Sequence, residues 1–159
     1  MEKIVLGIDP GIADTGYGFI RVSGSRLECL EYGSIKTPAG TPLPERLQTL
    51  YNELKRLLKK HRPQAAAVEQ LFFNKNVRTA LIVGQARGVA LLAVSQAGVP
   101  LSDFTPAQVK MAVSAYGQAS KLQIQKMVKL ILNLKELPQP DDAADALAVA
   151  ICGANHHRY

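Results

Sequence analysis

Residues Val5–Gly11 read VLGIDPG, an apolar segment that ends in an acid, a proline and a glycine. The wider stretch Lys3–Asp9 is rich in Ile, Val and Leu, and it predicts a buried β-strand. The turn after this strand supplies no basic residue to pair with Asp9. Asp9 is therefore either a turn residue before Pro-Gly or part of a site, and acids at similar positions decide between the two.

The next two segments predict further strands. Thr15–Ser23 and Leu27–Lys36 alternate apolar and polar residues, and Gly24 between them is typical of a hairpin turn. These three strands are expected to form an antiparallel meander. Leucines at helical spacing then run from Leu43 to Leu58, and Pro63 ends that predicted helix.

The rest of the chain alternates strands and helices. QAAAVEQ (64–70) predicts a fourth strand ending at Glu69, and VPLSDFTP (99–106) predicts a fifth. Helices are predicted within residues 76–98, 106–117, 121–134 and 141–155. The order β-β-β-α-β-α-β-α-α-α, without a repeat or a linker, predicts one α/β domain over residues 1–159. A strand that returns through a helix is usually parallel to its neighbour, so the carboxyl ends of the first and fourth strands are expected side by side.

Composition narrows the class of protein. The chain has 159 residues, 47% of them hydrophobic, and a formal net charge of +6, which favours a polyanionic partner such as nucleic acid. Its two cysteines, Cys29 and Cys152, have no metal-ligand or redox spacing, which suits a reducing cytoplasm. We find no signal peptide and no apolar run long enough to span a bilayer, so no membrane association is expected.

Acids recur at the ends of the predicted elements. If the first and fourth strands are parallel neighbours, Asp9 and Glu69 meet at one edge of the sheet. Two carboxylates at close range raise each other's pKa unless a positive charge lies between them, and Mg²⁺ prefers oxygen ligands of this kind. The last predicted helix is almost entirely apolar, yet its first turns carry Asp141, Asp142 and Asp145. Asp145 shares a helix face with either of the other two.

Each acid also has an ordinary structural explanation. Glu69 at a strand end is compatible with simple exposure to solvent. Either Asp141 or Asp142 is a good helix N-cap. The hypothesis of a metal site therefore depends on all of the acids converging in space.

The sequence resembles the RuvC-type crossover-junction endodeoxyribonucleases, or Holliday-junction resolvases, over essentially its whole length. The matching segments stand in the family's order and spacing: GIDPGIADTGYG (7–18), VEQLFFNKN (68–76), LIVGQARGVALLA (81–93), FTPAQVKMAVSAYGQASKLQIQKMV (104–128) and DDAADALAVA (141–150). The resemblance implies an RNase H-like fold with a mixed five-stranded sheet flanked by helices. It also implies that the catalytic and metal-binding carboxylates are Asp9, Glu69, Asp142 and Asp145. Some members carry histidine at the position of Asp142.

The implied chemistry is two-metal hydrolysis of phosphodiester bonds in two opposed strands of a four-way DNA junction. Two Mg²⁺ ions about 3.5–4 Å apart, for which Mn²⁺ can substitute, clamp the scissile phosphate in such sites. Asp9 is expected to bridge both ions, and Glu69 and Asp145 are each expected to bind on one side of the pair of ions. Asp142 is expected to complete the coordination shell of an ion or to orient the water. No serine, cysteine or histidine arrangement competes as a nucleophile, and His61, His156 and His157 are expected to be solvated.

Basic and aromatic residues near these acids predict a DNA surface. Phosphate contacts are expected from Lys75, Arg78, Arg87, Lys110 and Lys121, and the last two match basic residues that the family uses near the junction. Phe72 matches an aromatic used at the branch point, with Phe73 as the alternative. The basic cluster at the end of the first helix is more simply explained by the helix dipole.

The resemblance also implies partners, and other functions remain to be weighed against it. Gly84 and Gly88 lie one helical turn apart, either to pack against the domain's own sheet or to form the homodimer that the resemblance implies. The RuvA–RuvB branch-migration complex is the other implied partner. Three alternatives are an actin-like or sugar-kinase ATPase, a non-catalytic junction-binding protein, and a related nuclease acting on structured RNA. The short chain argues against the first, and the presence of all four acids argues against the second.

Overall fold

The computed structural model describes residues 1–70 and 76–156, and it confirms the predicted α/β class and order of elements. Within the described residues, the strands are β1 (Glu2–Asp9), β2 (Asp14–Ser23), β3 (Arg26–Lys36), β4 (Ala65–Glu69) and β5 (Leu101–Phe104). The helices are α1 (Leu43–His61), α2 (Val77–Gln96), α3 (Pro106–Ser114), α4 (Lys121–Ile131) and α5 (Asp141–His156).

The strands form a mixed five-stranded sheet in the order β3-β2-β1-β4-β5. β1, β2 and β3 pair antiparallel, as their hairpin connections require, whereas β1–β4 and β4–β5 are parallel. Ile8 of β1 lies opposite Val68 of β4. The last residues of these two strands, Asp9 and Glu69, therefore end side by side at one edge of the sheet.

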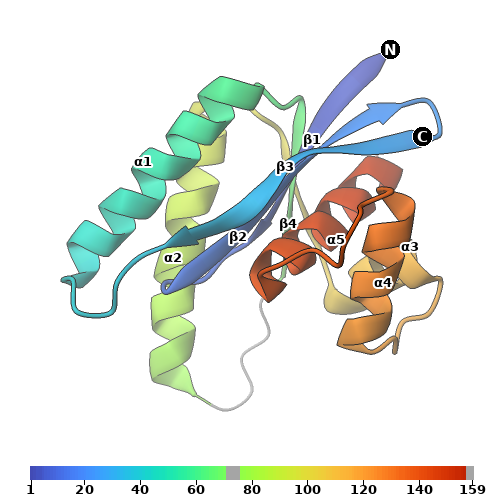
Figure 1. Cartoon of the computed structure of the whole chain (residues 1–159). Coiled ribbons are helices and arrows are strands. Elements are labelled where there is room, and N and C mark those ends of the chain that lie inside the picture. The colour runs from blue at the N-terminus through green and yellow to red at the C-terminus, as the bar shows by residue number, and fades with distance from the viewer. Residues whose placement is uncertain (71–75, 157–159) are drawn as a thin grey trace.

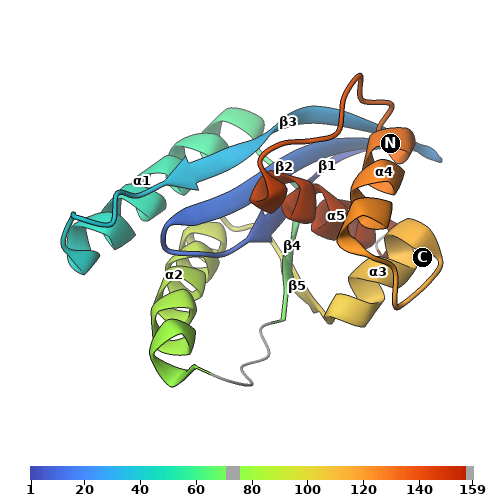
Figure 2. The same cartoon turned by 60° about the horizontal axis from the view of Figure 1, so that its bottom comes forward.

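Helices cover both faces of the sheet, with α1 and α2 on one face and α3, α4 and α5 on the other (Figure 1, Figure 2). Because side chains alternate along a strand, Leu6 and Ile8 join the core beneath α1 and α2, while Val5 joins the core beneath α5. The same alternation places Asp9 on the α5 face. In β4, Ala65 and Ala67 belong to the α5 core, so Glu69 takes this face as well.

Helix α5 packs against the sheet at backbone distance. A Cβ atom at Gly7 would overlap the carbonyl oxygen of Ala146, and one at Gly16 would overlap the carbonyl oxygen of Asp142. Both glycines are therefore required by the close approach of the helix. The alanines of α5 are the helix's contribution to the same contact, since most of them are fully buried.

Helix α2 changes one expectation. Its 20 residues are long and apolar enough to cross a membrane by length and composition, and it is the one such helix among the described residues. No apolar run of this length was expected from the sequence, and Arg78 and Arg87 lie within the helix. Only 22% of this apolar window is buried within the domain, with Ala86 and Ala90 in the same core as Leu6 and Ile8.

We expect Gly7→Ala to lower the free energy of unfolding by about 1–3 kcal/mol, because the new methyl group forces α5 away from β1. Urea denaturation measures this change. Gly40→Ala is the matched control: its Cβ meets open space, so the free energy should change by less than about 1 kcal/mol. Equal effects of the two substitutions would contradict the packing described for α5.

Candidate active site

Three carboxylates converge where β1 ends beneath the start of α5. Asp9 is the last residue of β1, and Asp142 and Asp145 lie in the first turns of α5. One oxygen from each of these three acids lies within 4.8 Å of the other two, and all three side chains are partly buried. We call Asp9, Asp142 and Asp145 the acidic triad.

Glu69 stands beside the acidic triad without belonging to it. It ends β4 next to Asp9, and it lines a pocket together with Asp145. The triad and Glu69 thus bring to one place all four carboxylates that the resemblance singled out. Among the described residues, the group of acids whose oxygens lie within 4.8 Å of one another includes the first three and not Glu69.

The turn that follows Asp9 is fixed by buried threonines. The hydroxyl of Thr15, which is 1% exposed, donates to the carbonyl oxygen of Gly11 at 2.6 Å and accepts from its N–H at 3.3 Å. Thr37 donates a backbone hydrogen bond to the carbonyl of Ala13 and a side-chain hydrogen bond to that of Ile12. Asp9 therefore projects from a turn with an internal hydrogen-bond network.

Burial and mutual repulsion raise the pKa of every acid at this site. Burial, followed by the charges of Asp145, Asp142 and Glu69, raises the pKa of Asp9 to about 8 from an ordinary value of 3.8. Burial is also the main reason why the pKa values of Glu69, Asp142 and Asp145 are raised. With a pKa of about 8, Asp9 keeps its proton at neutral pH unless a cation replaces it.

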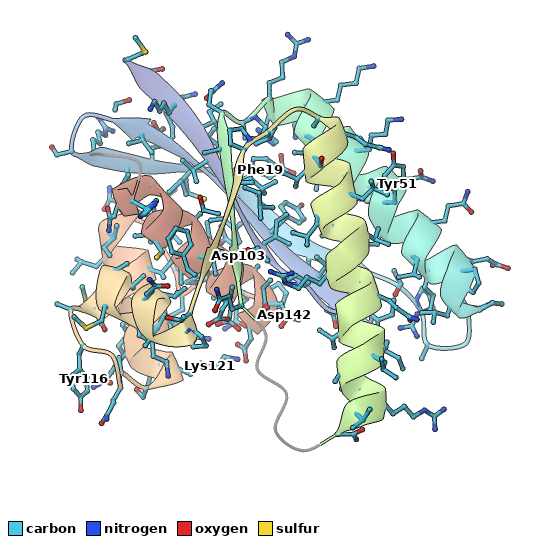
Figure 3. The ribbon with its side chains drawn as sticks, turned by 180° about the vertical axis from the view of Figure 1, so that it is seen from behind. Phe19, Tyr51, Asp103, Tyr116, Lys121 and Asp142 are labelled. Atoms are coloured by element: carbon cyan, nitrogen blue, oxygen red, sulfur yellow. The ribbon has the colours of Figure 1, made fainter. Side chains whose placement is uncertain are left out.

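Two lysines line an open pocket of about 230 Å³ beside the acids. Lys110 and Lys121 line this pocket with Glu69 and Asp145, above an apolar floor that includes Val109. Lys110 opposes the rise in the pKa of Glu69, and Lys121 opposes it for the acidic triad. Lys121 and Asp142 lie toward the same edge of the molecule in Figure 3.

A larger cavity of about 500 Å³ lies between α1 and α2. No acid is among the described residues that line it, which include Tyr51, Lys55 and Arg62. The smaller pocket therefore matches the carboxylate chemistry, and volume alone does not mark the site.

The other predicted DNA contacts have different surroundings. Arg78 is exposed in the first turn of α2. Arg87 forms an ion pair with Asp103 of β5 and its side chain is only 21% exposed, so it is engaged within the domain. Phe72 and Lys75, together with Phe73, lie outside the described residues.

The expectation of a solvated His61 was wrong. Its side chain is 12% exposed, its Nε2 lies 2.7 Å from Glu31 Oε2, and its ring stacks on Phe19 at 4.2 Å. Helical spacing indicated only that the residue ends α1, because a contact with β3 is not visible in local sequence. His156 ends α5 and packs edge-on against Phe104, while His157 lies outside the described residues.

Two acids near the site were not assigned from the sequence. Asp14, at the start of β2, raises the pKa of Asp142 and is itself paired with Lys36 at 3.3 Å. Asp141 pairs with Lys121 at 3.3 Å and stays outside the acidic triad. The segment DTG after the first turn was the available signal for Asp14. Its proximity to Asp142 could be recognised only once β2 had been placed beside α5.

The donor set at this site suits a hard divalent cation. Carboxylate oxygens at close range, with pKa values raised by burial and then by repulsion, suit Mg²⁺ or Mn²⁺ better than metals that prefer thiolate ligands. The open pocket beside them leaves room for an anionic substrate. A mixed sheet in this order, with acids at the adjoining ends of β1 and β4 and at the start of the last helix, defines the RNase H-like class of metal-dependent nucleases.

Comparisons with known proteins identify the family. Residues 5–153 match the family model of the crossover junction endodeoxyribonuclease RuvC. The chain is 56% identical over 156 residues to this endonuclease from Pelotomaculum thermopropionicum, covering 98% of this chain and 95% of the relative. Two solved structures of Thermus thermophilus RuvC, alone and in complex with a Holliday junction substrate, align with TM-scores of 0.90 and 0.93. Each has 39% identity and covers 98% of this chain and 95% of the solved chain.

The chain therefore belongs to the RuvC family of crossover junction endodeoxyribonucleases.

The raised pKa of Asp9 predicts how stability depends on pH. The folded state keeps the proton of Asp9 up to about pH 8, whereas the unfolded state releases it near pH 4, so metal-free wild type loses stability as the pH rises between these values. Asp9→Asn removes this loss. In chelator, the gain in unfolding free energy of Asp9→Asn over wild type should be larger at pH 8.5 than at pH 5 by about 1–3 kcal/mol.

Urea denaturation at both pH values measures the difference. Glu136→Gln, at an exposed acid in the segment before α5, should show the same effect at both pH values. An Asp9→Asn gain that does not vary with pH would contradict the described coupling of the acids.

Proposed function

We propose that residues 1–159 act as one nuclease domain that resolves four-way DNA junctions by hydrolysing phosphodiester bonds in two opposed strands. The observation that carries this proposal is the acidic triad, whose Asp145 lines one open pocket together with Glu69, Lys110 and Lys121. Membership in the RuvC family and the solved complex of a 39% identical relative with a Holliday junction support it. We propose that the protein acts in the cytoplasm, whose reducing conditions suit its two free cysteines, Cys29 and Cys152.

Asp9, Asp142 and Asp145 would hold Mg²⁺ together with Glu69, and we propose two ions in each site, with Mn²⁺ as a substitute. When bound, the metal supplies a polarised water and stabilises the negative charge of the leaving 3′-oxygen. The charges of Asp145, Asp142 and Glu69 all act on Asp9, so Asp9 would be the ligand common to both ions. Lys110 and Lys121 neutralise the phosphate opposite the acids.

Substitution of the acids tests the assigned roles. Asp9→Asn, Glu69→Gln and Asp145→Asn should each lower Mg²⁺-dependent cleavage of a four-way junction by about a hundredfold or more, because each removes a charged metal ligand. Junction affinity measured in Ca²⁺ should stay within a few-fold of wild type. Glu136→Gln should cleave like wild type, and wild-type cleavage by one of the acid variants would remove that residue from the site.

The choice of substrate separates the rival functions. Wild type should cut the four-way junction in preference to linear duplex DNA of the same sequence and to a structured RNA. Preference for the RNA would support the alternative of an RNA-directed nuclease. Binding of the junction without cleavage in Mg²⁺ or Mn²⁺ would support the alternative of a junction-binding protein.

We further propose that two copies of the chain associate through α2. Gly84 and Gly88 do not pack against the domain's own sheet: both are exposed, and a Cβ at either meets open space. Leu81 and Leu92 flank them on the same helix and are 64% and 52% exposed. An apolar stripe with small residues at its centre suits close helix packing across a two-fold axis, which matches two scissile strands. The RuvA–RuvB complex is the proposed partner of the junction-bound dimer.

Gly84→Leu is expected to weaken self-association at least tenfold, because a bulky side chain separates the paired helices. Sedimentation equilibrium measures the dissociation constant. Since the Cβ of residue 84 meets open space within one chain, the variant should keep the wild-type circular dichroism spectrum. A wild-type protein that stays monomeric at high concentration, or a Gly84→Leu dimer of wild-type affinity, would contradict the interface.

A further inference from the structure

Asp141 is fixed by two residues of the neighbouring helix. Lys121 Nζ lies 3.3 Å from its Oδ2, and Gln125 Nε2 donates to its Oδ1 at 3.1 Å. Lys121 and Gln125 are four residues apart on α4, so both side chains project from one face of the helix. The two oxygens of Asp141 are thus held by two different partners, which sets the direction of the carboxylate.

The positions of these residues along their helices favour a functional role. Lys121 is the first residue of α4, after the N-cap Ser120, where the helix dipole disfavours a cation. Asp141 is the first residue of α5, where the dipole favours an anion. Gln125 is only 8% exposed, so the partner that orients Asp141 is itself fixed in the core. The pair therefore holds a cation at a place that its own helix does not stabilise.

Lys121 also reaches the acidic triad, since its Nζ lies 3.7 Å from Asp145 Oδ2. A divalent cation bound by the triad would take the charge of Asp145 and repel the lysine. Asp141 stays outside the triad, so its carboxylate remains available to Lys121 when the metal is bound. If Asp145 were its only partner, Lys121 would be displaced from the pocket when the metal binds, which is before the phosphate is cleaved.

We propose that Asp141, oriented by Gln125, is a positioning residue that keeps the ammonium group of Lys121 at the rim of the metal site, where it meets the scissile phosphate. This inference rests on the proposed nuclease function. It assigns to the acid beside Asp142 a role distinct from metal binding. Both partners of the ion pair are 56% exposed, so the pair contributes little to folding stability. We therefore expect its loss to change the rate of cleavage and not the stability of the fold.

Single-turnover cleavage of a four-way junction tests the effect on the reaction. Asp141→Asn keeps the size of the side chain and removes its charge, and it should slow cleavage at saturating Mg²⁺ by about tenfold through misplacement of Lys121. The double variant Lys121→Met/Asp141→Asn should be no slower than Lys121→Met alone. If Asp141 merely repels DNA, Asp141→Asn should instead bind the junction more tightly and lose no cleavage rate. That result, or additive losses in the double variant, would overturn the proposal.

A readout without DNA separates this inference from the proposed function. With Mg²⁺ alone, acylation of Lys121 by an amine reagent, followed by mass spectrometry, should be several-fold faster in Asp141→Asn than in wild type. Lys126, exposed on the same helix, serves as the internal reference, and Glu136→Gln is the control variant. Unchanged labelling of Lys121 would overturn the positioning role even if the wild type cleaves junctions. If Lys121 is labelled faster in Asp141→Asn although the wild type cleaves no junction, the positioning role is upheld while the nuclease assignment fails.

Discussion

The close contact of α5 with the backbones of β1 and β2 is the constraint on which the site depends. Gly7 and Gly16 leave no side chain between the helix and the strands, so the main chain of α5 rests directly on the sheet. The alternation of β1 places Asp9 two residues beyond Gly7 on this same face. The helix therefore delivers Asp142 and Asp145 to the acid that ends the strand, and a helix held one side chain further away would not.

Packing of this kind brings like charges together at a cost in stability. Burial and repulsion raise the pKa values of four neighbouring acids, and Lys110 and Lys121 compensate only in part. A fold under selection for stability alone would place apolar residues or a paired cation here. Local conflict of this sort is expected at a functional site, where a bound cation resolves it. The rest of the domain is conventional: two apolar cores, one on each face of the sheet, support the contact of α5.

Local sequence patterns predicted the fold and the convergence of Asp9 with Glu69, and the family resemblance selected the acids of the last helix. Strand alternation, helical spacing and the parallel return to the fourth strand were enough to place Asp9 beside Glu69. Spacing alone left Asp141 and Asp142 equivalent, since each shares a helix face with Asp145. The resemblance favoured Asp142, and the structure shows the physical difference: Asp142 turns toward Asp9, whereas Asp141 turns toward α4.

Long-range contacts account for what the sequence did not reveal. The ion pair of Arg87 with Asp103 and the burial of His61 against Glu31 and Phe19 each join segments that are distant in the chain. The outward orientation of Gly84 and Gly88 depends on which face of α2 meets the sheet. This helix is only weakly amphipathic, so its sequence did not indicate that face.

Binding of Mn²⁺ to Gly16→Ala tests the central claim most directly, because this variant keeps all four carboxylates and alters only the distance between α5 and β2. The affinity is measured by electron paramagnetic resonance at a temperature where circular dichroism shows the variant to be folded, with Gly40→Ala as the control. The account predicts that Gly16→Ala binds Mn²⁺ at least about tenfold more weakly than wild type, since the methyl group displaces Asp142 from the triad. A folded Gly16→Ala protein with wild-type affinity would show that the backbone contact of α5 does not determine the site.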